Sequence, residues 1–260
     1  MDNLFNFDFS VLVQQYFFPF VRVLALIMVA PITGEKEVPN RVKIALAVII
    51  TLLLPPADNY RAITVLSPLG IWIIIQQIIV GIVMGYTMQL AFMTLRIAGE
   101  LIGMQMGLSM ATFYDPIGGP ATSVLSRLFN IIGLLIFLSL DGHLWLLYCL
   151  GQSFDIIPIS TTLLNGNGYL TMIDSSALLF INGIMLALPI MTLLLIVNAA
   201  LGILNRMTPQ LSIFVVGYPA TLLLGLVILS YLMPTIVPFS QYLFNLFFNK
   251  LVAILAELGH

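Results

Sequence analysis

Long apolar runs, separated by short polar or proline-containing breaks, dominate this chain. Three uncharged runs cover residues 62–95, 175–205 and 207–249, and each exceeds the roughly 20 apolar residues that a helix needs to cross a bilayer. Segments such as Ile71–Ile75 lack the alternation of apolar and polar residues that is typical of membrane β-strands. Backbone groups in lipid must bond within their own segment, so the pattern predicts helices.

Proline, glycine and charged residues divide these runs into elements. We expect helices over residues 9–30, 41–54, 67 to 95 or beyond, 122–140 and 143–154. A loop with Pro158 and the turn Asn165–Gly168 then precedes a C-terminal hairpin. Its first arm is expected over 174–204, its tip over 205–210, and its return arm ends near Leu258. Three prolines are expected to break the return arm: Pro219, Pro234 and Pro238.

Composition narrows the class of protein further. Of 260 residues, 60% are hydrophobic and 8% are charged, whereas a soluble domain carries about 25% charged residues. The net charge of -2 provides no basic surface for a nucleic-acid partner. The single cysteine, Cys149, excludes an internal disulfide and a cysteine-based metal cluster. We therefore predict an all-α, membrane-associated fold of helical hairpins broken by proline and glycine, in contact with lipid, with no cofactor and no metal site.

Two features do not fit helices that each cross lipid alone. Arg22 lies near the middle of the first helix, where an arginine facing lipid costs about 2.5–3.5 kcal/mol. The second helix reaches only about 21 Å, short of a hydrocarbon core of roughly 30 Å. We expect some helices to pack inside a larger assembly. The basic residues of segment 35–43 place that segment on the cytoplasmic side and the N-terminus outside.

The segment 98–116 is rich in glycine and methionine. Gly99, Gly103 and Gly107 are four residues apart, and on a helix they would form one smooth ridge for close helix packing. A second interpretation is a plug or gate, because flexible apolar side chains adapt to irregular surroundings and apolar constrictions can close a pore. The candidate plug residues are Met104, Met106, Met110, Phe113, Tyr114 and Pro116. The residues alone favour packing over gating.

The remaining ionisable residues give weaker signals. Arg96 and Glu100 are four apart and could form an ion pair on one helix face, or contact a partner subunit. Asp141 and His143 flank Gly142 and form either a polar turn or a proton relay. The chain has no phosphate-binding loop, zinc-protease or nucleophile-elbow motif. We predict no catalytic residues and no enzymatic activity.

Several segments together resemble the FliR family of flagellar biosynthesis proteins, which belong to the type III secretion export apparatus. The resemblance extends nearly from end to end. The segments that carry it are Arg22–Leu26, Pro39–Lys43, Ala98–Pro116, Gly142–Trp145 and Asn205–Phe214.

This resemblance implies a FliP-like part over residues 1–160 with a plug loop at 104–120, followed by a FliQ-like hairpin over 170–260. It implies a hetero-oligomeric export gate with FliP-like and FliQ-like subunits in the bacterial inner membrane, within the flagellar basal body. An FlhB-like protein is expected at the entrance, and unfolded flagellar proteins are expected in transit. The predicted entrance and partner residues are Arg96, Glu100, Asn205, Arg206, Pro209 and Gln210.

The expected function is therefore a subunit that forms and gates the export conduit. One alternative is a stand-alone channel or secondary transporter, a class in which ionisable groups lie near the midplane and for which Arg22 is the candidate. Another is a purely structural nucleus for assembly, which gates nothing.

Overall fold

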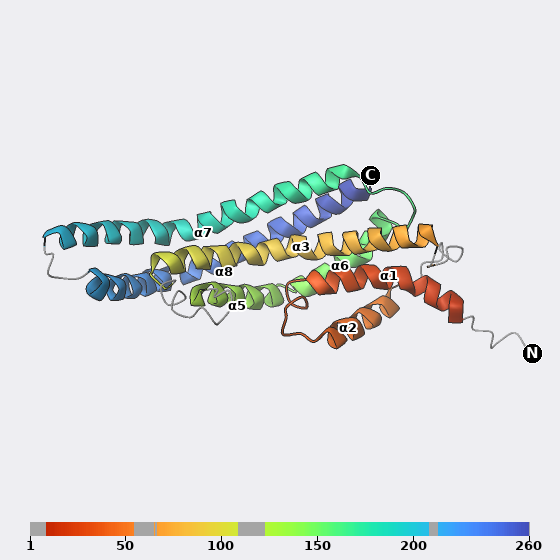
Figure 1. Ribbon diagram of the computed structural model, residues 1–260, viewed down its shortest axis with the longest axis horizontal. Helices are drawn as coiled ribbons and strands as arrows, with labels where there is room; N and C mark the ends of the chain where they lie inside the picture. Colours follow the sequence, from red (N-terminus) through yellow and green to blue (C-terminus); the bar gives the residue numbers. More distant parts are fainter. Residues whose placement is uncertain (1–8, 55–64, 66, 109–122, 208–212, 260) are drawn as a thin grey trace, which may run out of the picture. The chain divides into compact units, whose positions relative to one another are not determined.

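The computed structural model describes residues 9–54, 65, 67–108, 123–207 and 213–259. Within these ranges the regular elements are seven helices (Figure 1). They are α1 (Phe9–Val29), α2 (Asn40–Leu53), α3 (Pro68–Gln105), α5 (Val124–Ser139), α6 (Gly142–Ile156), α7 (Gly166–Met207) and α8 (Ile213–Gly259). The predicted all-α fold is confirmed.

Two predicted boundaries are wrong. The turn at Asn165–Gly168 is mostly helix, since α7 begins at Gly166 instead of near residue 174. The side-chain oxygen of Asn165 accepts a hydrogen bond from the N–H of Asn167 at 3.2 Å, which supports this early start. The return arm also runs unbroken as α8, with Pro219, Pro234 and Pro238 inside it. A proline removes one helical hydrogen bond, and apolar surroundings favour keeping all the others.

Three helices in the described part of the chain are long and apolar enough to cross a membrane: α3, α7 and residues 217–259 of α8. Residues 124–139 and 142–156 would add a fourth if the pair is counted as one span. In the most apolar windows, half of the α3 residues are buried within the chain, against 17% for α7 and for α8. Most of α7 and α8 therefore presents apolar side chains outward, as a membrane-associated protein requires.

The chain divides into two compact units. The first contains residues 1–89, 143–175 and 247–260, and the second contains residues 90–142 and 176–246. The long helices α3, α7 and α8 contribute residues to both units.

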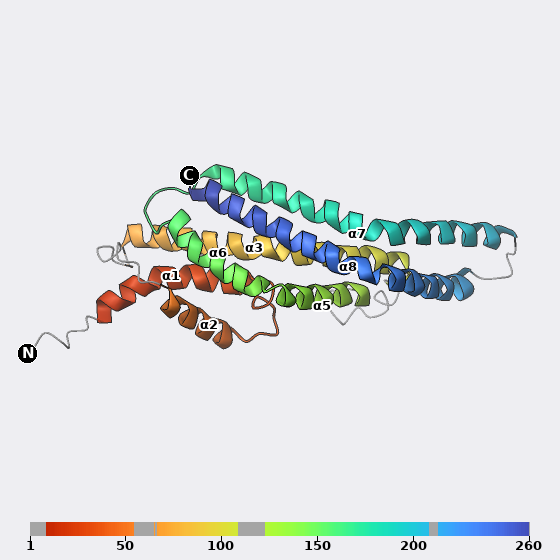
Figure 2. The ribbon, with the colours of Figure 1, turned by 180° about the vertical axis from the view of Figure 1, so that it is seen from behind.

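In the first unit, α1 crosses α3 at two glycines. A Cβ atom added at Gly81 would lie 2.7 Å from the Cβ of Ala25, and one at Gly85 would lie 3.0 Å from the Cβ of Val29. These glycines are four residues apart, so they form a small-residue contact of the kind that membrane helices use. The short helix α2 lies along α1 (Figure 2).

The core of the second unit is aromatic. The rings of Phe92 (α3), Phe137 (α5) and Phe244 (α8) lie with their centroids 5.3–5.4 Å apart in every pairing. Gly133 of α5 leaves room for the side chain of Leu95, which would otherwise meet a Cβ atom. This cluster joins three helices without any polar group.

Candidate functional site

Arg22 lies inside the first unit with no exposed surface. Its Nε donates to the side-chain oxygen of Gln77 at 2.7 Å. Its Nη1 donates to the carbonyl and the hydroxyl oxygens of Ser153 at 2.7 and 3.0 Å, and its Nη2 donates to the carbonyl oxygen of Ile157 at 2.8 Å. The guanidinium carbon lies 4.2 Å from the ring centroid of Phe154. We refer to these five residues as the arginine clamp.

The arginine clamp binds the free carbonyl groups at the C-terminus of α6. The last carbonyl groups of a helix have no partner within the helix, and that end carries a partial negative charge. Ser153 lies in the last turn of α6 and Ile157 directly follows the helix, so Arg22 caps the end from a neighbouring helix. The charge in the apolar first helix therefore joins α1, α3 and α6.

Sequence reasoning identified Arg22 but missed its partners. Gln76 and Gln77 interrupt an otherwise apolar run, and buried amides need hydrogen-bond partners. Both are buried, and the Nε2 of Gln76 donates to the carbonyl oxygen of Thr162 at 2.5 Å. Two adjacent glutamines in an apolar run were the sequence signal for buried hydrogen bonds at this position.

Gly99 and Gly103 lie against the start of α5, within the second unit. A Cβ atom added at Gly99 would lie 2.7 Å from the Cα of Ser126, and one at Gly103 would lie 3.0 Å from the Oγ of Ser123. The Oγ of Ser126 donates to the carbonyl oxygen of Arg96 at 3.0 Å across the same contact. For these two glycines the structure supports the packing interpretation.

Gly107 lies beyond the end of α3 and does not extend this ridge, so its predicted place on the ridge is wrong, although an added Cβ atom there would lie 2.7 Å from the Cδ1 of Tyr218 in α8. It follows the end of α3 at φ +80°, a conformation that glycine adopts without strain. The N–H of Gly107 donates to the carbonyl of Met104, and the N–H of Leu108 donates to that of Gly103, at 3.1 and 2.9 Å. This pair of bonds is a Schellman motif, which ends the helix.

Arg96 and Glu100 both contact the segment that begins α5. The Nε of Arg96 donates to the side-chain oxygen of Asn130 at 2.8 Å. A carboxylate oxygen of Glu100 accepts a hydrogen bond from the backbone N–H of Ser123 at 3.0 Å. Ser123 is also the N-cap of α5 and accepts the N–H of Ser126 at 3.1 Å. The two charged residues thus help to position the first turns of α5.

Two of the candidate plug residues lie in the described part of the chain, and they differ in exposure. Met104 is half-exposed, whereas Met106 is 1% exposed and lies on Gly225 of α8, where an added Cβ atom would be 2.6 Å from its Cγ. Met106 is therefore an internal packing residue. The other plug candidates lie outside the described residues: Met110, Phe113, Tyr114 and Pro116.

Two of the predicted entrance residues lie at the end of α7. Asn205 is half-buried and Arg206 is exposed, in the last turn of the helix. Pro209 and Gln210 lie outside the described residues. The predicted turn at Asp141 is confirmed, because this residue has φ 53° between α5 and α6.

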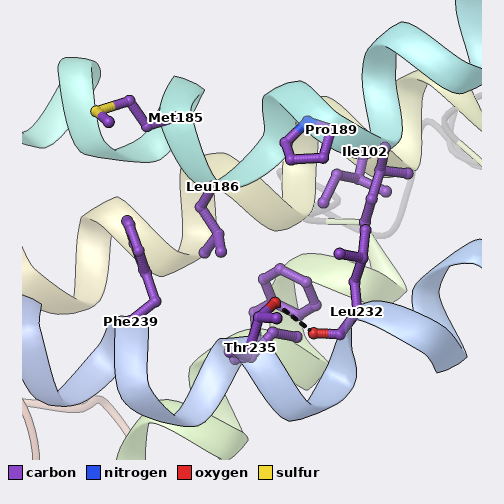
Figure 3. Close-up of a pocket in the computed structure, with 10 residues that line it drawn as sticks. Ile102, Met185, Leu186, Pro189, Leu232, Thr235 and Phe239 are labelled. Atoms are coloured by element: carbon purple, nitrogen blue, oxygen red, sulfur yellow. Dashed lines mark hydrogen bonds between the residues drawn. The ribbon is translucent and has the colours of Figure 1, made fainter.

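An apolar hollow of about 280 Å³ lies in the second unit, with walls from α3, α5, α7 and α8. Figure 3 shows Leu186, Pro189 and Phe239 around it. The hydroxyl of Thr235 donates to the carbonyl oxygen of Leu232 at 2.7 Å (Figure 3). This hydroxyl is thus already engaged, and the hollow suits hydrocarbon better than an ion or a polar substrate.

The fold and these contacts define an all-helical, membrane-associated protein whose buried polar groups hold helices together. Within the described residues, no cluster of three or more His, Cys, Asp or Glu side chains could hold a metal ion.

The chain belongs to the family of bacterial export proteins, family 1, whose model matches residues 13–247. Among its relatives, the flagellar biosynthetic protein FliR of Pectobacterium carotovorum subsp. carotovorum is 51% identical over 247 residues, which cover 95% of each chain. The FliR protein of Escherichia coli (strain K12) is 49% identical over 94% of this chain and 93% of its own. That of Bacillus subtilis (strain 168) is 26% identical over 92% and 94%.

Proposed function

We propose that this chain is a subunit of the flagellar type III export gate in the bacterial inner membrane, at the core of the basal body. Together with FliP-like and FliQ-like subunits it forms and gates a conduit for unfolded flagellar proteins, and an FlhB-like protein binds at the entrance. The proposal depends on one observation, the 51% identity to a flagellar biosynthetic protein over 95% of both chains.

The exposed apolar surface supports a role in an assembly. Only 17% of the most apolar windows of α7 and α8 is buried within the chain. Exposed side chains on these helices include Phe180, Ile196 and Leu223. Lipid or neighbouring subunits must cover such surface, because exposed apolar patches of this kind mark membrane or protein contacts.

The arginine clamp argues against the transporter alternative. A transporter would use an ionisable group near the midplane to bind substrate or a coupling ion. The guanidinium of Arg22 instead donates to oxygens of Gln77, Ser153 and Ile157. It has a structural task that accounts for its presence in an apolar helix.

Within this proposal, residues 104–120 form the plug. Met106 anchors its first end by packing on Gly225, and Ser123, bonded to Glu100, follows its second end. The plug would act by filling space, and an exported chain would displace it. The apolar side chains that seal the pore would then be those beyond Met106.

The test measures ion leak through the assembled complex. Replacing Met110 and Phe113 by Ala should raise the leak while assembly continues, because the seal loses apolar volume. Ile203→Ala, which shortens a 65% exposed side chain on α7, is the matched control and should leave the leak unchanged. Met106 is left intact because its replacement would disturb internal packing.

The same preparation distinguishes the alternatives. Co-purification of FliP-like and FliQ-like proteins with the tagged chain is the expected result. An intact complex with unchanged leak would favour the structural nucleus over the gate. A stable, solitary chain that transports a solute in vesicles would favour the transporter and contradict the proposal.

A further inference from the structure

The short helix α2 buries polar side chains and exposes apolar ones. Its buried residues are Lys43, Ala47 and Thr51, whereas a water-soluble helix buries its apolar face. The exposed residues are apolar: Val42, Ile44, Val48, Ile49, Leu52 and Leu53, each between 42% and 81% exposed. The outer face of α2 therefore requires an apolar environment.

The inward polar groups of α2 are satisfied within the chain. The ammonium group of Lys43 donates to the carbonyl oxygens of Gly34 and Glu35, both at 3.1 Å. The hydroxyl of Thr51 donates to the carbonyl oxygen of Ala47 at 2.6 Å. One of the two basic groups of α2 is thus turned inward.

A groove of about 210 Å³ runs between α1 and α2. Its walls are aromatic on the α1 side and mostly aliphatic on the α2 side, and they are formed by Tyr16, Phe17, Phe20, Val48, Thr51 and Leu52. The Thr51 hydroxyl in this wall already has a partner. The groove is suited to a hydrocarbon chain.

Arg41 lies on the same face of α2 as two groove residues, about two turns before Val48. Residues 41, 48 and 52 are seven and eleven positions apart, so the helical repeat places Arg41, Val48 and Leu52 on one face. Arg41 and Leu52 are separated by about 16 Å along the axis. One leaflet contributes about 15 Å to the hydrocarbon core, so the distance matches the depth of a single leaflet.

The N-terminal end of α2 carries exposed basic groups that suit an anion. Arg41 and Lys36 are exposed, and Glu35 and Glu37 flank Lys36 in the sequence. The N-cap residue of α2, Pro39, supplies no side-chain cap, and helix N-termini of this kind bind phosphate through their N–H groups. Among the described residues, none accepts a hydrogen bond from the guanidinium of Arg41. Segment 35–43 carries three basic and two acidic residues and is therefore weakly basic.

We propose that the groove between α1 and α2 binds one anionic phospholipid. The phosphate lies at Arg41 and the first turn of α2, and an acyl chain runs along the groove between α1 and α2. The cytoplasmic leaflet carries anionic lipid, and the basic residues of segment 35–43 favour that side. The proposal does not depend on export activity, so it can fail while the proposed function holds.

The test uses the full chain in nanodiscs made of equal parts of phosphatidylglycerol and phosphatidylcholine. Native mass spectrometry after release from the discs counts the phospholipids that remain bound. Wild-type protein should retain phosphatidylglycerol preferentially. Arg41→Ala should lower its retention about five-fold, as expected for one basic group at an anionic surface. Lys250→Ala, which removes a basic group from α8, should leave retention unchanged.

A second pair of variants tests the groove. Val48→Asn places an amide in the groove wall and should reduce retention of phospholipid. Ile49→Asn introduces the same group at the next position, which does not line the groove and is similarly exposed, and should leave retention unchanged. Arg41→Lys keeps the charge and should retain phosphatidylglycerol, which separates loss of binding from loss of folding.

Two results would overturn the proposal. One is equal retention of phosphatidylglycerol by Arg41→Ala and wild type when both give the same thermal unfolding curve. The other is a photoreactive benzoylphenylalanine at position 52 that forms, in cells, adducts with a protein instead of with phospholipid. The second result would identify the outer face of α2 as a subunit interface.

Discussion

In the first unit a buried guanidinium joins α1, α3 and α6, whereas in the second unit α3 meets α5 through glycine backbone and α8 through aromatic rings. Arg22 makes four hydrogen bonds to oxygens on two other segments. Gly99 instead allows α5 to approach so closely that an added Cβ atom would lie 2.7 Å from the Cα of Ser126. A substitution should therefore have different consequences at the arginine contact and at the glycine contact.

Loss of the arginine leaves polar atoms in an apolar interior without their donor. An unpaired polar atom in the interior costs more free energy than its hydrogen bond contributes to the stability of the intact protein. A glycine contact fails in another way, because an added methyl group forces two backbones apart. Polar contacts in this chain should therefore be more sensitive to substitution than the glycine contacts.

Arg22→Leu should have the largest effect. It leaves the oxygens of Gln77, Ser153 and Ile157 without this donor, and the expected loss in the free energy of unfolding is roughly 3–5 kcal/mol. Thermal unfolding of the purified protein in mild detergent, followed by tryptophan fluorescence, measures the change. An unchanged unfolding temperature would show that the arginine clamp does not stabilise the first unit.

Gly99→Ala should have an intermediate effect of about 1–3 kcal/mol, because the new methyl group meets backbone atoms of α5 that cannot move independently. The matched control is Gly202→Ala in α7, where an added Cβ atom has no neighbour within 4 Å. That control should be neutral or stabilising by up to about 1 kcal/mol, as alanine favours helix. Equal unfolding temperatures for the two variants would contradict the close packing at Gly99.

Ser123→Ala should have the smallest effect, a loss of about 1 kcal/mol, which is typical of removing an N-cap. The backbone N–H of Ser123 still donates to Glu100 in this variant, so α5 should keep its position. The same unfolding measurement applies, with Ser123→Thr as the control that keeps the hydroxyl. A loss as large as that of Arg22→Leu would show that the second unit also depends on polar contacts.

The sequence predicted most helices within a few residues, because apolar runs in this chain end at proline, glycine or charge. The early start of α7 was missed because Asn165–Gly168 is typical of a turn, and its role as a helix start depends on the hydrogen bond from Asn165. The three prolines of α8 were wrongly predicted to break the helix, which continues through them. Gly107 was placed on the wrong element because a four-residue spacing does not show where a helix ends.

The candidate site was only partly predictable. The position of Arg22 in an apolar helix predicted that it needs polar partners. Those partners, Ser153 and Ile157, are more than 130 residues away in the sequence, so they could not be predicted. Met106 and Met104 look equivalent in the sequence, yet one is buried on Gly225 and the other is half-exposed. Spacing along a chain shows which face of a helix a residue occupies, but not which helix that face meets.

The amino-acid sequence by itself determined that this protein is helical, that it needs apolar surroundings, and that a buried arginine must find oxygen partners. These follow from local composition and from the need of every backbone group in lipid for a hydrogen bond. Only the tertiary structure decided that the arginine caps α6, that two of the three glycines meet α5, and that α2 turns its lysine inward. Those outcomes depend on contacts between distant segments, whose geometry arises only when the helices pack together.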